Sequence, residues 1–388
     1  MPGTFRRPRA AFGLFLAGLL SACGGGSIPG PSGPNPPTLP AGVRVISYYP
    51  DWAKTNTPAY SAAQIPYGKL THIEHAFLTI DPSANGDLMP DANLLEPQLI
   101  QMAHAHGVKV LISVGGGDGI QGPALNVMAA DPVAVSNFIA QLKTFVTSNG
   151  YDGVDIDWEI PITLDDANRC TAVMQALRTA LPPPALISMA VTSNPAWPDV
   201  NGGYGAFDIP SLTPLVDFFN VMTYDFTGPW ADYAGLNSPL YQDPADPDQM
   251  GSLKTSVDLY LNTYHVPPAK LNMGTAFYGY RFDGVSSLWE TCVPDCSGTV
   301  SVNYGPDIKP LINQGWTAQF DSVAQAPYLL KASGTGFITY DDGASTKRKS
   351  QYVIGTRGLG GIFSWSLNAD YDGSSQDLLD AMYQGALP

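Results

Sequence analysis

The chain has 388 residues, of which 44% are hydrophobic and 14% charged, and its formal net charge is −15. This balance is typical of a folded globular protein, and the length suits one large domain that carries an insertion. The negative charge argues against nucleic acid as a partner, because its phosphates would be repelled.

The first residues are not predicted to belong to the fold. Three arginines within the first nine residues precede an apolar stretch at residues 10–20, which is too short to span a membrane as a mature helix. Leu20-Ser-Ala-Cys23 follows, and it resembles the lipobox of a bacterial lipoprotein precursor. The resemblance implies a signal peptide over residues 1–22, a lipid on Cys23 and a place in the bacterial cell envelope, at the outer membrane or cell surface. The alternative is an ordinary secretory signal with an incidental cysteine.

Residues 23–41 are rich in Gly, Pro and Ser and contain almost nothing apolar. Such a segment cannot bury a core, so it predicts a tether between the lipid anchor and the folded domain.

From residue 42 onward, short apolar strands alternate with helical stretches, as in a parallel sheet with crossover helices. Eight such strands predict a closed (β/α)₈ barrel over residues 42–388. The predicted strands are Val43–Tyr49, Leu70–Leu78, Val108–Val114, Gly153–Trp158, Leu186–Val191, Phe218–Thr223, Leu271–Phe277 and Gly361–Ser366. The polar motifs of the chain stand at the carboxyl ends of these strands, where barrels of this class place their chemistry.

The segment Tyr151–Pro161 carries the most informative pattern. Asp152 is followed by Asp155, Asp157 and Glu159, and these last three alternate with Val, Ile and Trp. In a strand the three acids therefore share one face and the apolar residues the other. Three carboxyls on one face cannot all ionise cheaply, so at least one should hold its proton near neutral pH. A protonated carboxyl beside a carboxylate can act as a general acid on a glycosidic bond.

Two other interpretations of this segment are weaker. A calcium loop requires glycine at its sixth position and polar residues between the acids, not Val, Ile and Trp. A solvated acidic face rarely contains interleaved β-branched and aromatic residues.

Three cysteines lie in the predicted folded domain. Cys292 and Cys296 predict a local disulfide in an exported protein. A pair of zinc ligands is the alternative, although no nearby histidine or further cysteine completes a tetrahedron. Cys170 falls in a predicted helix over residues 165–181, where we expect a buried free thiol.

The interval between the seventh and eighth predicted strands is too long for a single helix. Its residues 282–340 are rich in Gly, Tyr, Trp, Ser and Thr, which predicts a small α+β insertion domain. The alternative, an irregular loop, is uncommon at this length.

Four motifs in chain order resemble the signatures of the family 18 glycoside hydrolases, the chitinase family. They are the serine-glycine stretch Val110–Gly116, the acid series that ends at Glu159, the Met-Thr-Tyr-Asp segment of residues 222–225, and the closing strand Gly360–Trp365. The resemblance extends over about residues 43–372, and it implies a barrel with the active site at the carboxyl ends of its strands.

The resemblance also implies roles for individual residues. Glu159 is the expected general acid, which protonates the glycosidic oxygen and later deprotonates water. No second carboxylate is evident as a nucleophile, and in this family the substrate's own 2-acetamido oxygen attacks the anomeric carbon. Asp157 would then orient the acetamido N–H, Asp155 would share a proton with Asp157, and Tyr224, with Asp225 beside it, would hold the acetamido group.

Aromatic residues are expected to bind the sugar rings. By resemblance, Trp365 forms the floor beneath the distorted sugar, and Trp230 contacts the sugars of the leaving group. Tyr48 is expected to line the cleft as well, whereas Phe77 is as easily part of the core. Gly116 would let the backbone pass close to the acid-bearing strand.

Two positions depart from the family pattern. Arg281 stands one residue later than the family's arginine after Gly279, and Asn368 replaces a common aspartate. Five histidines show no metal-ligand spacing with acids, so neither a metal nor a cofactor is expected.

The sequence therefore predicts a monomeric chitinase that acts on chitin or chito-oligosaccharides, chains of β-1,4-linked N-acetylglucosamine, with net retention. An endo-β-N-acetylglucosaminidase that acts on N-glycans or peptidoglycan fragments is the alternative within the same class. A chitin-binding lectin on an inactive scaffold is the third, although such proteins typically lose the glutamate that stands here as Glu159.

Overall fold

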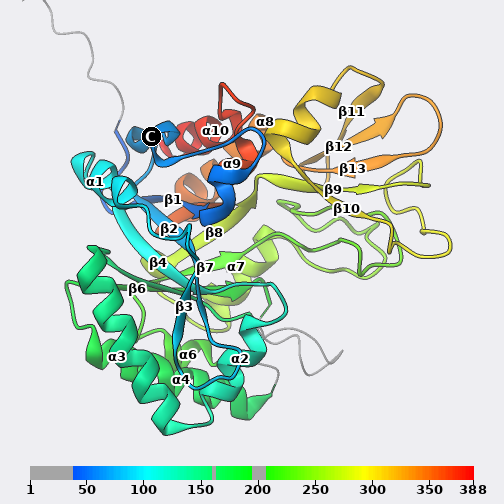
Figure 1. Ribbon diagram of the computed structural model, residues 1–388. Helices are drawn as coiled ribbons and strands as arrows, with labels where there is room; N and C mark the ends of the chain where they lie inside the picture. The colour runs from blue at the N-terminus through cyan, green and yellow to red at the C-terminus, as the bar shows by residue number, and fades with distance from the viewer. Residues whose placement is uncertain (1–37, 160–162, 195–206) are drawn as a thin grey trace, which may run out of the picture. The chain divides into compact units, whose positions relative to one another are not determined.

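The structure is a computed structural model, and it describes residues 38–159, 163–194 and 207–388 (Figure 1). The predicted signal peptide, the lipidation site Cys23 and most of the predicted tether lie outside the described residues. No helix within the described ranges is long and apolar enough to cross a membrane.

Eight parallel strands form the barrel. Around the ring they follow the order β1-β14-β8-β7-β6-β5-β4-β2, and the pairing of β1 with β2 closes it. Their bounds are β1 Arg44–Pro50, β2 His72–Ile80, β4 Lys109–Gly115, β5 Gly153–Asp157, β6 Leu186–Thr192, β7 Phe218–Met222, β8 Leu271–Ala276 and β14 Gly361–Trp365. The predicted fold class is confirmed, and every predicted strand end lies within two residues of the observed one. A short strand, β3 (Leu88–Pro90), pairs antiparallel with β2 outside the ring.

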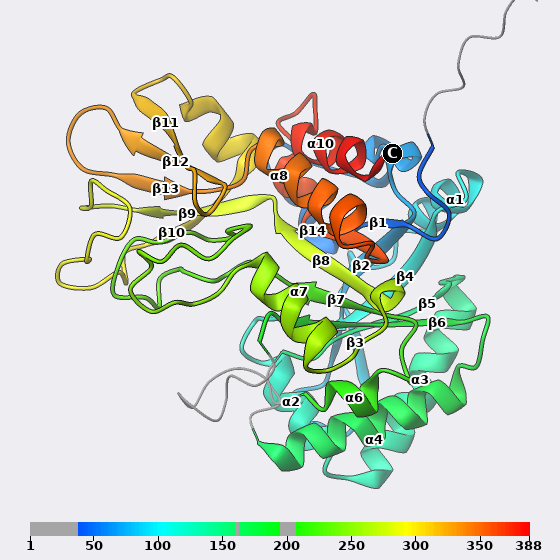
Figure 2. The same ribbon diagram turned by 180° about the vertical axis from the view of Figure 1, so that it is seen from behind.

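Helices connect the strands and cover the outside of the barrel (Figures 1 and 2). They are α1 Pro97–Ala105, α2 Gln121–Met128, α3 Pro132–Asn149, α4 Leu164–Ala180, α6 Ile209–Leu212, α7 Leu253–Asn262, α8 Gly343–Ser350, α9 Leu367–Asp370 and α10 Asp377–Ala386. Short helical turns occur at Asp51–Thr55, Ala62–Gln64, Tyr67–Lys69, Pro268–Lys270, Tyr304–Ile308, Lys309–Leu311 and Gln351–Thr356. The predicted helix around Cys170 is α4, and this cysteine is a buried free thiol as predicted.

The helix α3, which leads into the acid-bearing strand, has clear start and stop signals. The Asp131 side chain accepts a hydrogen bond from the Val133 N–H at its beginning, and Pro132 takes the first helical position. Gly150 ends the helix with φ +78°, a left-handed conformation that favours glycine. The chain then enters β5 after only two more residues, which fixes the position of the acids.

The strand β5 separates two environments by simple alternation. Val154, Ile156 and Trp158 belong to the apolar core between the barrel wall and the helices, and each is at most 1% exposed. Burial of each such side chain stabilises the fold by roughly 1.5–3 kcal/mol. Asp155 and Asp157 point the other way, into the barrel, as the alternation predicts.

A second sheet is formed by the chain between β8 and β14. Its strands follow the order β10-β9-β13-β12-β11 and are all antiparallel, and Figure 1 shows it beside the barrel in yellow and orange. The bounds are β9 Tyr278–Phe282, β10 Val300–Asn303, β11 Trp316–Asp321, β12 Ala326–Lys331 and β13 Phe337–Thr339. The sheet thus begins at Tyr278, only two residues after β8 ends, whereas the insertion was expected from residue 282. A disulfide joins Cys292 and Cys296 in the loop between β9 and β10.

Candidate active site

Asp155 lies inside the barrel and is held by hydroxyl groups from three other strands. Tyr48 on β1 and Ser113 on β4 donate hydrogen bonds to its Oδ2 atom, at 2.8 and 2.7 Å. Ser188 on β6 donates to Oδ1 at 2.7 Å. Complete burial raises the pKa of Asp155, and the three hydroxyl donors act against that rise because they favour the carboxylate. These three donors stabilise a negative charge on Asp155 inside the barrel.

Asp157 is the next acid along β5 and is far less well satisfied. It is 4% exposed, and its Oδ1 atom has no hydrogen-bond partner among the described residues. Burial raises its pKa well above the usual range, and the neighbouring Glu159 and Asp155 carboxyls raise it further. Asp157 therefore holds a proton when Asp155 is charged, and its Oδ1 atom keeps an unused capacity to form a hydrogen bond.

Glu159 follows two residues after Asp157, beyond the end of β5, and is half-buried. Burial raises its pKa to about 7, with smaller contributions from the charges of Asp225 and Asp118. The backbone of Gly117 runs directly against its carboxyl group, since a Cβ atom at that glycine would lie 2.4 Å from Oε2. A carboxyl that keeps its proton up to neutral pH at the mouth of the barrel has the properties of a general acid.

Tyr224 and Asp225 follow the end of β7 after one intervening residue, and β6 and β5 separate β7 from β4 in the ring. The Tyr224 ring packs on Gly274 of β8, where a Cβ atom would lie 2.7 Å from the ring. Burial, and then the charge of Asp157, raise the pKa of Tyr224 well above the usual range, so its hydroxyl is a neutral donor. Asp225 has φ +61°, which is uncommon for a residue with a side chain.

Three residues outside the predicted set hold Asp225 in that conformation. The Asn237 side chain accepts a hydrogen bond from the Asp225 N–H at 2.9 Å. Tyr278 and Tyr280, on β9 of the second sheet, donate to Asp225 Oδ1 at 2.5 and 2.8 Å. Burial raises the pKa of Asp225, and these two hydroxyls lower it again. The second sheet therefore contributes directly to the site.

Aromatic rings gather at the barrel mouth beside the acids. The Trp365 ring lies 5.5 Å from that of Phe77, with 19° between their planes, and 5.4 Å from that of Tyr48. Phe77 is thus half-buried at the mouth, next to Gly116, where a Cβ atom would lie 2.9 Å from its ring. Trp52, an aromatic that the sequence also offers for the cleft, contacts both Phe77 and Trp365 and is 41% exposed.

Trp230 lies on the side of the second sheet. It is 51% exposed, and its ring meets the edge of Tyr280 at 5.7 Å and 83°. An exposed indole held by a tyrosine that also binds Asp225 is suited to pack against a sugar ring.

Two residues of the sequence motifs lie away from the acids. Asp152 binds Lys109, His104 and the Val110 N–H near the amino end of β5, at 2.7 to 2.9 Å. Arg281 follows Tyr280 on β9, and its guanidinium contacts Asp283 at 3.3 Å. Because neighbours on a strand face opposite ways, Arg281 points away from Asp225.

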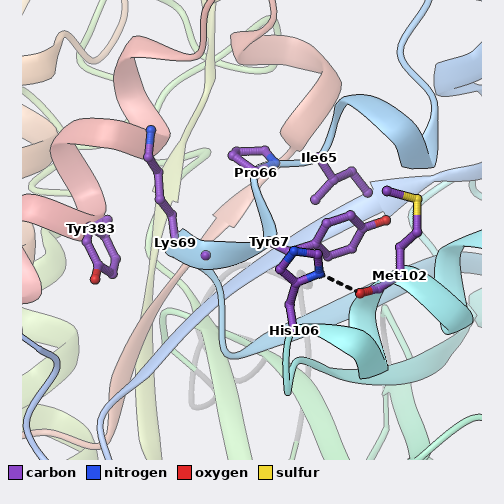
Figure 3. Close-up of a pocket in the computed structure, with 8 residues that line it drawn as sticks. Ile65, Pro66, Tyr67, Lys69, Met102, His106 and Tyr383 are labelled. Atoms are coloured by element: carbon purple, nitrogen blue, oxygen red, sulfur yellow. Dashed lines mark hydrogen bonds between the residues drawn. The ribbon is translucent and has the colours of Figure 1, made fainter. Parts of the chain in front are cut away.

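A separate groove lies away from the acids, and Figure 3 shows the side chains that line it. Its volume is about 520 Å³, and it is lined by residues 65–69, Met102, His106 and Tyr383. Residues 65–69 precede β2 and His106 precedes β4, so the groove is at the amino ends of the strands, far from Glu159. The His106 ring in this groove stacks on Tyr67 and forms a hydrogen bond with the Met102 carbonyl at 2.8 Å. Within the described ranges no group of three or more His, Cys, Asp or Glu side chains is arranged to hold a metal ion.

The chain is similar in sequence to known chitinases. Chitinase A1 of Niallia circulans is 27% identical over 411 residues, a match that covers 87% of this chain and 58% of that protein. A probable endochitinase of Caenorhabditis elegans is 33% identical over 285 residues, which cover 68% of this chain and 44% of that protein. This chain therefore spans little more than half, or less, of the length of these two relatives.

The fold comparison agrees with the sequence comparison. The crystal structure of the Ostrinia furnacalis Group IV chitinase in complex with allosamidin has a TM-score of 0.77 and 25% identity, and the match covers 88% of this chain and 98% of that one. Residues 44–370 match the pattern described as glycosyl hydrolases family 18, which takes in every barrel strand and all the acids of the site. Since this match covers most of the chain, the protein belongs to the family 18 glycosyl hydrolases.

Proposed function

We propose that the protein is a chitinase, which hydrolyses chains of β-1,4-linked N-acetylglucosamine with net retention at the anomeric carbon. The observation that carries the proposal is the line of three acids on β5 and just beyond its end, from the well-bonded Asp155 through the unpaired Asp157 to the half-buried Glu159. Asp155 carries the one negative charge, and Asp157 and Glu159 each hold a proton. An acid-catalysed cleavage without an enzyme nucleophile requires this distribution. The names of the relatives support chitin as the substrate.

In the first step the Glu159 carboxyl gives its proton to the glycosidic oxygen and the leaving sugar departs. The 2-acetamido oxygen of the substrate attacks the anomeric carbon, so that a bicyclic oxazolinium ion forms. The carboxyl group of Asp157 accepts a hydrogen bond from the acetamido N–H, and the Tyr224 hydroxyl donates to its oxygen. In the second step Glu159, now a carboxylate, removes a proton from water, which attacks from the side that the leaving group vacated.

Asp225 is an unsuitable nucleophile for the alternative, two-carboxylate route. Its Oδ1 atom already accepts hydrogen bonds from Tyr278 and Tyr280, and burial raises its pKa. A carboxylate whose oxygen is bound in this way is less free to reach a sugar carbon. Participation of the acetamido group explains the chemistry without such a nucleophile.

The test is time-resolved analysis of the products from a chitin hexamer, with the anomers resolved by NMR. Retention predicts that the β-anomer forms first, and an oligomer with a free amine in place of the acetamido group at the cleaved sugar should not be hydrolysed. Initial formation of the α-anomer, or equal cleavage of the amine analogue, would refute the mechanism. Cleavage of a high-mannose glycopeptide in preference to the hexamer would replace chitin by N-glycans, and binding without turnover would identify a lectin.

We also propose that Cys23 carries a lipid and attaches the protein to the cell envelope. The proposal rests on the apolar stretch at residues 10–20 and on the lipobox-like sequence that ends at this cysteine. In cells fed a labelled fatty acid, the full-length chain should be labelled and the Cys23→Ser variant should not. Equal labelling of the two would contradict the assignment.

A further inference from the structure

Glu74 is a buried acid for which the proposed mechanism has no use. It lies in the middle of β2, where its neighbours across the barrel wall are Tyr48 on β1 and Leu111 on β4. Its side chain points into the barrel and is 0% exposed. An acid placed there without a function would cost several kcal/mol if ionised and unpaired.

Ser188 links this acid to the catalytic line. The Glu74 Oε1 atom lies 3.4 Å from the Ser188 Oγ atom, and the same hydroxyl lies 2.7 Å from Asp155 Oδ1. A hydroxyl group has one proton, and the shorter contact shows that it is donated to Asp155. Ser188 can then only accept a hydrogen bond from Glu74, and Glu74 can donate one only when it is protonated.

The other contacts of Glu74 do not provide a balancing charge. Asn220 donates an amide hydrogen to Oε1 at 3.4 Å, and Oε2 has no hydrogen-bond partner among the described residues. The cation of this network is Arg44, which is two amide groups away. Arg44 donates to Asn272 at 2.9 Å, Asn272 donates to Asn220 at 2.9 Å, and Asn220 contacts Glu74 at 3.4 Å. No ion pair to Glu74 occurs within the described ranges.

The electrostatic surroundings agree with a neutral side chain. Burial raises the pKa of Glu74 well above its usual value, and the Asp155 carboxylate on β5 raises it further. Tyr48 on β1 is the other titratable group whose charge couples to Glu74, and its own pKa is raised by burial. The strands β6 and β7 present only Ser188 and Asn220, which do not titrate.

We propose that Glu74 is a positioning residue of the active site, a permanently neutral acid whose proton, passed as a hydrogen bond to Ser188, fixes the Ser188 hydroxyl on Asp155. This proposal rests on the proposed function and deepens it. A fixed donor keeps the negative charge on Asp155, and Asp157 and Glu159 can then keep their protons at the start of each cycle.

Two variants of Glu74 distinguish three possible roles of its side chain: a neutral hydrogen-bond donor, a negative charge, or a group that only fills space. Glu74→Gln keeps the size and a donor group, so kcat on the chitin hexamer should stay within about threefold of the wild-type value and both limbs of the pH profile should stay in place. Glu74→Met keeps an unbranched side chain without a donor, so kcat should fall roughly tenfold with KM little changed. Leu111→Met, which alters an apolar neighbour on the same inner face, is the control for packing.

A double-mutant cycle tests whether Glu74 acts through Ser188. Ser188→Ala should lower kcat on its own, and adding Glu74→Met to it should have no further effect. Independent, multiplying effects would overturn the proposal, as would full activity of Glu74→Met. A shift of the profile of Glu74→Gln toward acid pH would show that Glu74 is charged in the native protein, and this too would overturn it.

Infrared spectroscopy measures the proton directly and does not depend on catalysis. The difference spectrum between wild-type protein and Glu74→Gln at pH 7 should contain the C=O band of a protonated carboxyl group. Carboxylate bands alone would overturn the proposal, even if Glu74→Met fails to fold. If instead the wild-type protein does not cleave the hexamer, the proposed function fails while the infrared result still decides the state of Glu74.

Discussion

Replacement of Glu159 by glutamine keeps the shape of the side chain and removes its titratable proton. In the folded protein the pKa of Glu159 is raised from 4.5 to about 7. At 1.36 kcal/mol for each pKa unit, ionisation of Glu159 costs at most about 3.4 kcal/mol more in the folded protein than in the unfolded chain. The same acid that serves catalysis therefore weakens the fold once it is ionised.

The sign of the pH dependence follows from the raised pKa. Below pH 4.5 Glu159 is protonated in both states, so the wild-type protein and Glu159→Gln should unfold with equal free energies. Between pH 4.5 and about 7 the wild-type protein should lose stability relative to the variant, and above pH 7 the difference should remain constant. Thermal unfolding at pH 4 and pH 8.5 measures this, with an expected gain of about 5 °C for the variant at the higher pH.

The activity of Glu159→Gln should fall although its stability at high pH rises. Loss of a general acid lowers kcat by about 10²- to 10⁴-fold, while binding of the chitin hexamer should survive. Glu290→Gln is a matched control, because Glu290 accepts hydrogen bonds from Ser286 and Ser287 in the loop after β9 and glutamine can do the same. Equal pH dependence of stability in Glu159→Gln and the wild-type protein, or unchanged turnover, would refute the assignment of Glu159 as the acid.

Three further changes test the surroundings of the acid. Asp118→Asn removes a charge that raises the pKa of Glu159, so the alkaline limb of the kcat/KM profile should move to lower pH by a few tenths of a unit. The shift should be smaller at high salt, and an unmoved limb would contradict this role of Asp118. Asn237→Ala leaves the Asp225 N–H without its acceptor, which should lower the free energy of unfolding by about 1–3 kcal/mol and reduce kcat; urea denaturation that shows no loss would exclude this role. Trp230→Ala should raise KM for the hexamer about tenfold with little change in kcat. An equal rise of KM for chitin dimers would argue that Trp230 does not bind a sugar distant from the cleaved bond.

The sequence contains enough information to place the acids of β5. Alternation alone puts Asp155 and Asp157 on the face opposite Val154 and Ile156, and the structure has both acids inside the barrel and both apolar residues outside. The eight strands could be predicted for the same reason, because buried parallel strands are short apolar runs between helices.

The partners of those acids depend on contacts that no local pattern reveals. Glu74 stands between Ile73 and His75 in the sequence, and only the pairing of β2 with β1 and β4 shows that it faces the barrel interior. Asn237 lies in a loop fifteen residues after β7 and has no periodicity to mark it. The Tyr-Gly-Tyr segment that contains Tyr278 and Tyr280 does place both tyrosines on one face of a strand. Which face meets Asp225 is decided by the pairing with β13, some sixty residues later in the chain.

The attachment of the second sheet to the barrel shows which of its parts can change in sequence without loss of the active site. Its strand β9 continues directly from the barrel strand β8, and β9 supplies the two tyrosines that hold Asp225. The strand β13 supports these tyrosines through its pairing with β9, and Thr339 on β13 binds Asn237. Among the described residues, the hairpin of β11 and β12 and the disulfide loop make no hydrogen bond to Asp225, Asn237 or the two tyrosine hydroxyls. Insertions or deletions in that outer part can therefore reshape the rim of the cleft, and with it the preferred length of polysaccharide, while the proton chemistry on the far side of the barrel mouth stays unchanged.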